Sequence, residues 1–415
     1  MFSRRQRSST ARPIGSGVVS GIGDDDPSAI GTYAQIGAAF GLALVWAPIA
    51  ALPIIVAVQV AVSRLGVVHG IGLVGVAKRQ LPRWLVVAVF VPVLLASVFT
   101  LGADLRAMAN ATGLIVPLPD GFLLACLTLI SFGLPIFLPY RRYRTVLRWF
   151  ALGIVAYLGV VLVADVDWAS VLDNVLRPHV PWDRSGVGAL IAVVGAAVSP
   201  YIIVWQANAE VEESRLTPGA PPPGAEWHRR AAVDVVAGLT TAIVAAVAIV
   251  IASATALHTA GITKVQTADD AARALEPLLG RAAGAAFAIG LLGVGLLAAP
   301  ILAGGAAFIG SELFGLRAGL GRRLKDAPGF YALLVAAAVA ALSLEVFGVP
   351  PVRALYYASI ANGVAAPGLL LLVLWLARSR RVLGGARIGR TGAALIALGA
   401  LAGVALPVAY FALPT

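Results

Sequence analysis

The stretch Gly23-Asp24-Asp25-Asp26-Pro27-Ser28 lies inside an otherwise apolar segment that runs from about residue 14 to residue 44. The segment is long enough to cross a bilayer, which takes about 20 apolar residues of helix. A carboxylate at membrane depth is costly and Pro27 removes a backbone donor, so an ordinary lipid-facing helix cannot continue through this point. Negative charge beside a helix break within the membrane is what a cation site in a transporter needs.

The composition identifies the setting of this segment. Hydrophobic residues make up 60% of the chain and charged residues 12%, and the mean hydropathy is +0.91. These values exclude a soluble domain and indicate an integral membrane protein. The sequence shows no nucleotide-binding loop, catalytic triad or zinc-ligand cluster, so we expect no enzyme, no bound cofactor and no nucleic-acid partner. The single cysteine, Cys126, excludes an intramolecular disulfide.

Eleven apolar segments are long enough to cross a bilayer. They cover residues 14–43, 45–63, 84–112, 120–139, 146–164, 186–209, 231–257, 282–312, 329–348, 353–377 and 389–412. The expected fold class is therefore an all-α membrane protein with eleven transmembrane helices in one transporter domain that covers residues 1–415.

The positive charges orient these segments. With the N-terminus in the cytoplasm, most of the 31 Lys and Arg residues fall in loops on the cytoplasmic side, as the positive-inside rule requires. The net charge of +11 is thus a topology signal. An odd number of segments places the C-terminus outside. We expect a multi-pass monomer in a prokaryotic-type inner membrane, with the lipid bilayer as its main partner.

A second break supports a repeated architecture. The sixth segment contains Ser199-Pro200-Tyr201 at its centre, so segments one and six are both interrupted by proline, at Pro27 and Pro200. Repeat units of five segments must have opposite topology in the membrane. The spacing predicts a five-plus-five inverted repeat, with residues 14–164 and 186–377 as its halves and residues 389–412 as an extra helix. Pro200 alone would be read as a simple kink, but paired breaks in two halves indicate a transport site.

The chemistry of the two breaks favours a hard cation. Both preceding half-helices direct C-terminal carbonyl groups, with partial negative charge, at one central volume, and Asp26 adds a full charge. Further oxygen donors are the hydroxyl groups of Ser28, Ser199 and Tyr201 and the freed carbonyl group of Ala196. A site of oxygen atoms alone suits Mg²⁺, Ca²⁺ or Mn²⁺ better than soft metals.

Four stretches resemble the natural resistance-associated macrophage protein (NRAMP) metal transporters. Asp24–Gly41, DDDPSAIGTYAQIGAAFG, is similar to the first helix of that family, which is marked by Asp-Pro-Gly-Asn and a Gly-Ala-Ala-Phe-Gly-like turn. Gln59–Gly70, Ala103–Leu105 and Val194–Tyr201 resemble its second-helix end, its Thr-Asp-Leu-Ala-Glu stretch and its Val-Gly-Ala-x-x-Met-Pro-His. The resemblance spans the chain in segment order. It implies the inverted-repeat fold shared with amino-acid transporters and proton-linked uptake of divalent metals.

The chain departs from this pattern at several ligand positions. The family's metal-binding Asp corresponds to Asp26. Its Asn, its sulfur-donating Met and the following His correspond to Ala29, Ser199 and Tyr201. Its glutamine in segment ten corresponds to Ser359. Loss of sulfur removes the soft-metal preference, and loss of Asn leaves more of the shell to water, which suits an ion that dehydrates reluctantly. The chain is similar to the branch that lacks the Met and carries magnesium.

The coupling residues of the family are also changed. Asp104 is kept in segment three, but the paired Glu is replaced by Ala107 and a cation, Arg106, lies nearby in sequence. A proton relay needs closely spaced titratable groups, so we expect weak or absent proton coupling. Asp104 and Arg353 are candidates for a buried charge pair, which serves either proton movement or static neutralisation.

Alternatives remain open at this point. Asp24 and Asp25 are candidates for an aqueous vestibule that leads to the site, where they serve the cation or only solvate a loop. The retained acidic charge favours a secondary transporter of a hard divalent cation, Mg²⁺ or Mn²⁺. The lost ligands favour a transporter of the same fold for a small organic solute, with a roomier pocket. A non-transporting relative has no positive support.

Overall fold

The computed structural model describes residues 25–137, 159, 161–162, 165–215, 225–273, 276, 280–343 and 348–414. Within these ranges the regular structure is entirely helical. The main helices are α2 (Pro27–Phe40), α3 (Trp46–His69), α5 (Arg83–Gly113), α6 (Asp120–Phe137), α10 (Arg184–Val198), α11 (Pro200–Arg215), α12 (Ala225–Ser253), α15 (Ala283–Phe314), α16 (Pro328–Ser343), α17 (Pro351–Arg378) and α19 (Arg390–Ala412).

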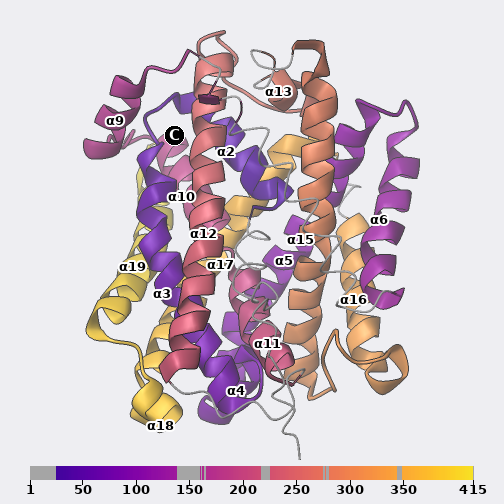
Figure 1. The fold of residues 1–415 in the computed structure, drawn as a ribbon, viewed down its shortest axis with the longest axis vertical. Helices are drawn as coiled ribbons and strands as arrows, with labels where there is room; N and C mark the ends of the chain where they lie inside the picture. The colour runs from indigo at the N-terminus through magenta and orange to yellow at the C-terminus, as the bar shows by residue number, and fades with distance from the viewer. Residues whose placement is uncertain are drawn as a thin grey trace, which may run out of the picture.

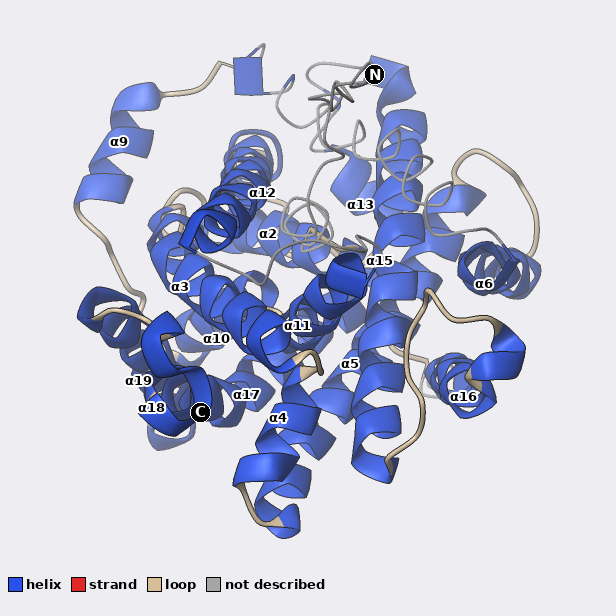
Figure 2. Ribbon diagram, turned by 60° about the horizontal axis from the view of Figure 1, so that its bottom comes forward, coloured by secondary structure: helices blue, strands red, loops and turns tan. Residues whose placement is uncertain are grey.

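The long helices form one bundle whose axes run in roughly the same direction (Figure 1). Helices α2, α5, α10, α11 and α17 occupy its interior, and they pack against one another. Helices α6 and α16 lie on one flank and α19 on the opposite flank (Figure 2). The two broken elements are thus surrounded by other helices.

Seven of the described helical segments are long and apolar enough to cross a membrane. Helices α6 and α16 are shorter apolar elements, and α2 is the second part of the expected first segment. The remainder of that first segment and most of segment 146–164 lie outside the described residues. The multi-pass, all-helical fold class is confirmed, whereas the count of eleven stays a prediction.

The expected break of the sixth segment is present. Helix α10 ends at Val198 and α11 begins at Pro200. Ser199 between them has φ 37°, and it is the one non-glycine residue with positive φ in the part of the chain that the structure describes. The Ser199 N–H donates to the Gly195 carbonyl group, which closes the last turn of α10. Since the left-handed region disfavours residues with a Cβ, the turn holds Ser199 in a strained conformation.

Helix α2 begins where the sequence predicts the first break to end. Asp26 is its N-cap in extended conformation, and Pro27 is the first helical residue, where a missing N–H is tolerated. The carboxylate of Asp26 accepts from the Ala29 N–H at 2.7 Å. The acidic residue and the proline therefore start this helix.

Glycines let the interior helices approach closely. A Cβ on Gly195 of α10 would collide with the Ser359 carbonyl oxygen of α17, and a Cβ on Gly363 would collide with the Ile191 carbonyl oxygen of α10. A Cβ on Gly37 of α2 would likewise meet the backbone of α12 at Val250. These positions require glycine because backbone approaches backbone without space for a side chain.

Short helices mark the two ends of the bundle. At one end lie α4 (Leu73–Gln80) and α18 (Arg380–Leu383), which carry Lys78, Arg79, Arg380 and Arg381. At the other end lie α9 (Trp168–Leu176), α13 (Ala268–Ala272) and the end of α19 (Figure 1). The last described residues thus lie at the end opposite to α4 and α18.

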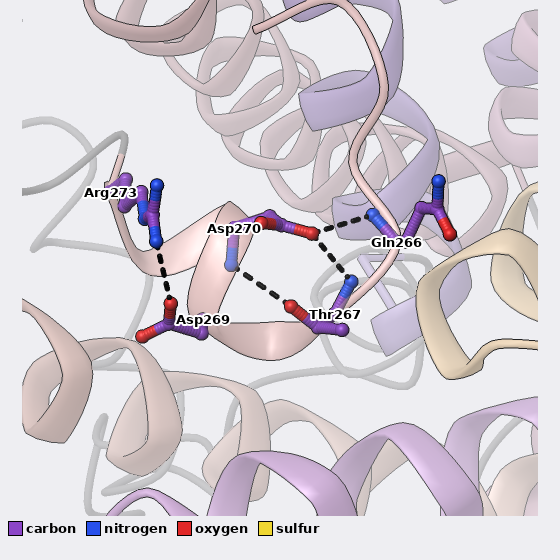
Figure 3. A network of polar contacts seen from close by, with 5 residues as sticks. All are labelled: Gln266, Thr267, Asp269, Asp270 and Arg273. Carbon is purple, nitrogen blue, oxygen red and sulfur yellow. Dashed lines mark hydrogen bonds and ion pairs between the residues drawn. The ribbon is translucent and has the colours of Figure 1, made fainter.

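A short helix, α13, lies between α12 and α15. Thr267 and Asp270 form a capping box: the Thr267 hydroxyl accepts from the Asp270 N–H at 3.2 Å, and the Asp270 carboxylate accepts from the Thr267 N–H at 3.1 Å (Figure 3). The same carboxylate accepts from the Gln266 N–H, while Asp269 pairs with Arg273 at 3.2 Å. These local bonds stabilise a helix of only five residues.

Candidate cation site

The carboxylate of Asp26 is the centre of the candidate site. It is buried, and three groups donate to it: the Ser28 hydroxyl at 2.6 Å, the Ala29 N–H at 2.7 Å and the Tyr201 hydroxyl at 2.7 Å. The first two come from the first turn of α2, and Tyr201 comes from the start of α11. One carboxylate therefore joins the beginnings of α2 and α11.

The break between α10 and α11 supplies more oxygen atoms. The Ser199 hydroxyl donates to the Ala196 carbonyl oxygen at 2.8 Å, which satisfies one of the carbonyl groups left free at the end of α10. The Ser199 carbonyl oxygen accepts from the Ile202 N–H at 2.9 Å as α11 begins. Ser199 and Ala196 are both buried. The carbonyl groups at this helix end carry partial negative charge, as the sequence predicts.

Helix α17 contributes Ser359. Its hydroxyl accepts from the Thr32 hydroxyl at 2.8 Å and donates to the Ser28 carbonyl oxygen at 3.4 Å, so it ties α17 to the first two turns of α2. Ser359 also lies against Gly195 through the close crossing of α10 and α17. The predicted residue of segment ten therefore reaches both broken elements.

Helix α5 contributes Asp104, which is fully buried. Neither of its carboxylate oxygens has a hydrogen-bond partner among the described residues. It lies within electrostatic range of Asp26 and near the backbone of Ser28. On the facing side of α17, the Asn362 amide donates to the Thr100 hydroxyl at 3.0 Å, while its Oδ1 has no partner among the described residues.

Together these side chains form what we call the central polar cluster. Its members are buried and come from α2, α5, α11 and α17 or from the breaks beside them: Asp26, Ser28, Thr32, Thr100, Asp104, Ser199, Tyr201, Ser359 and Asn362. Every one of them offers oxygen, and Asn362 alone adds a side-chain nitrogen. The chain has only two methionines, and Met108 packs against Gly295 of α15.

The arrangement has few carboxylates. No group of three or more His, Cys, Asp and Glu side chains that could hold a metal ion occurs among the described residues. A cation at Asp26 would therefore rely on one or two carboxylates, neutral hydroxyl and carbonyl oxygens, and water. Such a donor set suits a hard cation that keeps part of its hydration shell.

Some predicted residues lie apart from the cluster. Arg353 is exposed in the first turn of α17, and no ion pair joins it to the buried Asp104. The expected pair is therefore absent, because the guanidinium stays hydrated at the helix end. Arg106 lies two residues from Asp104, about 200° around the helix, and so faces away from it. Asp25, expected in an aqueous vestibule, is buried, and Asp24 lies outside the described residues.

Three cluster residues were missed from the sequence: Thr32, Thr100 and Asn362. The available signal was helical spacing. Thr100 lies four residues before Asp104, and Asn362 lies three residues after Ser359, so each shares a helix face with a residue already singled out. A polar residue at such a spacing in an apolar helix belongs with its neighbour on that face.

A comparison with known families matches nearly the whole chain. The family model described as natural resistance-associated macrophage protein-like matches residues 17–413. The chain belongs to the NRAMP family. As an NRAMP protein it is a multi-pass membrane protein of a transporter family, and the resemblance of its motifs is confirmed.

Curated relatives within the NRAMP family are similar over most of their length. The divalent metal cation transporter MntH of Acidiphilium cryptum (strain JF-5) is 28% identical over 393 residues, which cover 93% of this chain and 86% of the relative. The protein of the same name from Verminephrobacter eiseniae (strain EF01-2) is 28% identical over 398 residues, or 92% and 84% of the two chains.

Solved structures share the NRAMP fold of this chain. A crystal structure of the Eremococcus coleocola manganese transporter has a TM-score of 0.75 at 17% identity and covers 96% of this chain and 85% of its own. Mhp1, a nucleobase-cation-symport-1 family transporter, has a TM-score of 0.60 at 14% identity and covers 97% and 92%. At these identities the likeness concerns the fold alone, and it agrees with the expected all-helical fold class.

Proposed function

We propose that this NRAMP protein is a secondary transporter that moves a hard divalent cation, Mg²⁺ or Mn²⁺, through the central polar cluster. Similarity to proteins named divalent metal cation transporter supports the substrate class. The absence of any catalytic arrangement in the sequence supports a role in transport and not in catalysis. A bilayer and the transported ion are its only proposed partners, and the protein acts as a monomer.

One observation carries the proposal: the buried Asp26 lies at the start of α2 against the break between α10 and α11, where two hydroxyl groups and one backbone N–H donate to it. A carboxylate is too costly at membrane depth to serve packing alone. Carboxylate, hydroxyl and carbonyl oxygens are the ligands that Mg²⁺ and Mn²⁺ prefer. Sulfur, which selects softer metals, is missing from the cluster.

The hydrogen bonds around Asp26 describe how a cation would enter. Oδ2 accepts from Tyr201, and Oδ1 accepts from Ser28 and Ala29. An arriving cation takes the place of donor hydrogens, so the Tyr201 and Ser28 hydroxyl groups turn their oxygen lone pairs inward. Rotation of the Ser199 side chain releases the Ala196 carbonyl oxygen as a further ligand. Water completes the shell.

We propose weak or absent proton coupling. Asp104 is the one titratable side chain on its face of α5, because Ala107 replaces a carboxylate one turn further along. Tyr201 occupies the place of an imidazole, and its hydroxyl is already bonded to Asp26. A proton on Asp104 thus has no carboxylate acceptor one turn further along α5. The membrane potential, worth about 2.3 kcal/mol per charge per 100 mV, can drive cation entry without protons.

The orientation follows from the charges. Basic residues gather at the end that carries α4 and α18, so we assign that end to the cytoplasm of a prokaryotic-type inner membrane. The C-terminus then lies outside, and residues before the first segment lie inside.

The proposal is tested by titrating purified protein with Mg²⁺, Mn²⁺, Ca²⁺, Cd²⁺ and a panel of organic amines, and by uptake into proteoliposomes. Asp26→Asn should abolish both cation binding and uptake, whereas Asp269→Asn, an exposed carboxylate on α13, should change neither. Binding of amines but not of cations would overturn the proposal and favour an organic solute. Cation binding that survives Asp26→Asn would place the site elsewhere.

A further inference from the structure

A groove lies on the outer surface of the bundle between α17 and α19, away from the central polar cluster. Its volume is about 890 Å³, within the usual range of about 300–1,000 Å³ for small-molecule sites. Its apolar wall comprises Leu371, Leu374 and Trp375 of α17 and three alanines of α19. Its polar end comprises Arg378, Ser379 and Arg390.

The groove opens outward from the helix bundle. Leu371 and Trp375 are about half exposed, at 52% and 48%. Helix α19 is the least covered of the seven apolar spans, with 22% of its apolar window buried. Apolar side chains that face outward from a membrane bundle meet lipid chains, and a Trp near a helix end is typical of the membrane–water interface.

The polar end of the groove carries two arginines that form no ion pair within the described residues. Arg378 ends α17 and Arg390 begins α19, and both are exposed. Neither forms an ion pair within the described residues, and residues 346–415 contain no Asp or Glu at all. Two guanidinium groups without a carboxylate partner favour a phosphate group, which they can bind through several N–H donors.

The apolar wall and the basic end together select one kind of occupant. Leu371 and Arg378 are seven residues apart on one helix, or about 10 Å along its axis. A molecule with a phosphate at one end and an apolar chain along the groove satisfies both. We propose that this groove is a specific binding site for an anionic phospholipid, with its phosphate on Arg378 and Arg390 and an acyl chain along Leu371 and Leu374.

Native mass spectrometry of the full-length protein in detergent tests this site. The probes are phosphatidylglycerol and phosphatidylethanolamine with identical chains. Arg378→Gln with Arg390→Gln should weaken phosphatidylglycerol binding about 30-fold, because each basic side chain near an anionic lipid contributes a factor of about five. Arg380→Gln with Arg381→Gln, an equal charge change on α18 outside the groove, should leave binding unchanged.

Two further measurements test the same site: a groove-filling variant and competition by inorganic phosphate. Ala394→Trp fills the groove without a charge change and should also reduce lipid binding, which keeps the test valid if the double Arg variant does not fold. Inorganic phosphate added in excess should not displace the lipid, since it lacks the acyl chain. Equal retention of both lipids, an equal loss in the control variant, displacement by phosphate, or a second copy of the chain on this face would overturn the proposal.

Discussion

The hydroxyl group of Tyr201 lies 2.7 Å from Oδ2 of Asp26, although 175 residues separate them. This contact joins the start of α11 to the start of α2. A phenol donor thus occupies an oxygen that the proposed cation also needs.

Tyr201→Phe should lower the stability of the ligand-free protein by about 1.5–3 kcal/mol, because a hydrogen bond to a carboxylate is lost. The loss should shrink at saturating Mn²⁺, where the cation replaces the donor. Thermal unfolding with and without Mn²⁺ measures both values. Tyr331→Phe is the control: it removes a hydroxyl bonded to the Arg322 carbonyl oxygen at 2.7 Å and should cost the same in both conditions. An equal loss of stability in Tyr201→Phe with and without Mn²⁺ would contradict the idea that the cation replaces the Tyr201 donor.

A sulfur ligand introduced at residue 199 should shift the metal preference toward softer metals. Ala29→Asn with Ser199→Met should raise the affinity for Cd²⁺ relative to Mg²⁺ by about tenfold or more, because a thioether favours softer metals. Ala29→Asn with Ser199→Ala serves as the sulfur-free control. The positive φ at position 199 makes methionine strained there, so unfolding should be measured alongside titration. An unchanged Cd²⁺ to Mg²⁺ ratio would mean that residue 199 does not contact the ion.

Two isosteric changes should have opposite effects on stability. Asp104→Asn should raise the unfolding temperature of the ligand-free protein, since a buried carboxylate without partners is costly. Asp26→Asn should lower it, because three donors to a carboxylate are disturbed. Scanning calorimetry of both variants compares them directly. A fall for Asp104→Asn would indicate that a bound group satisfies this carboxylate.

Proton flux in proteoliposomes should remain weak in the wild type and in Asp104→Asn alike.

The crossing of α10 and α17 should tolerate no side chain. Gly195→Ala should destabilise the fold by about 1–3 kcal/mol or prevent its assembly, because its Cβ meets the Ser359 carbonyl oxygen. Gly389→Ala, where a Cβ meets nothing within 4 Å, is the matched control. Yield and unfolding temperature are the readouts. Equal behaviour of the two variants would show that the helices can separate at little cost.

The cap of α10 gives a pH-dependent prediction. The Gly186 N–H, at 2.6 Å, and then the Ser185 hydroxyl hold the pKa of Asp183 below its usual value. A lowered folded-state pKa adds stability above the unfolded pKa, and that stability is lost as the pH falls through the folded pKa. Asp183→Ala should therefore lower the unfolding temperature by about 1–3 °C at neutral pH and not in strong acid. Asp173→Ala, in an exposed pair with Arg177, should change little at either pH.

The sequence predicted the parts of this fold that depend on local chemistry. Proline disfavours a continuous helix, so the break at Ser199-Pro200 and the start of α2 at Pro27 were visible without a structure. Runs of apolar residues likewise marked most of the long helices. The short helices α4 and α9 were not anticipated, because eight or nine residues with mixed polarity give little periodic signal.

The candidate site was predicted in part for the same reason. Asp26 carries a signal of its own, since charge is rare at membrane depth. The partners of Ser359 and Asn362 depend on which helix faces which, and a single sequence does not contain that information. The expected ion pair of Asp104 with Arg353 is absent for this reason. Asp104 is buried in the interior, whereas Arg353 is exposed at the start of α17.

The reciprocal glycine contacts of α10 and α17 make these two helices one rigid pair. Because backbone touches backbone at Gly195 and Gly363, the two helices cannot rotate independently. Helix α19 joins them, since the Arg184 side chain at the start of α10 donates to the Leu413 carbonyl oxygen at 3.0 Å. A change of direction of α11 relative to this pair of helices would pivot at Ser199, where α10 ends and α11 begins.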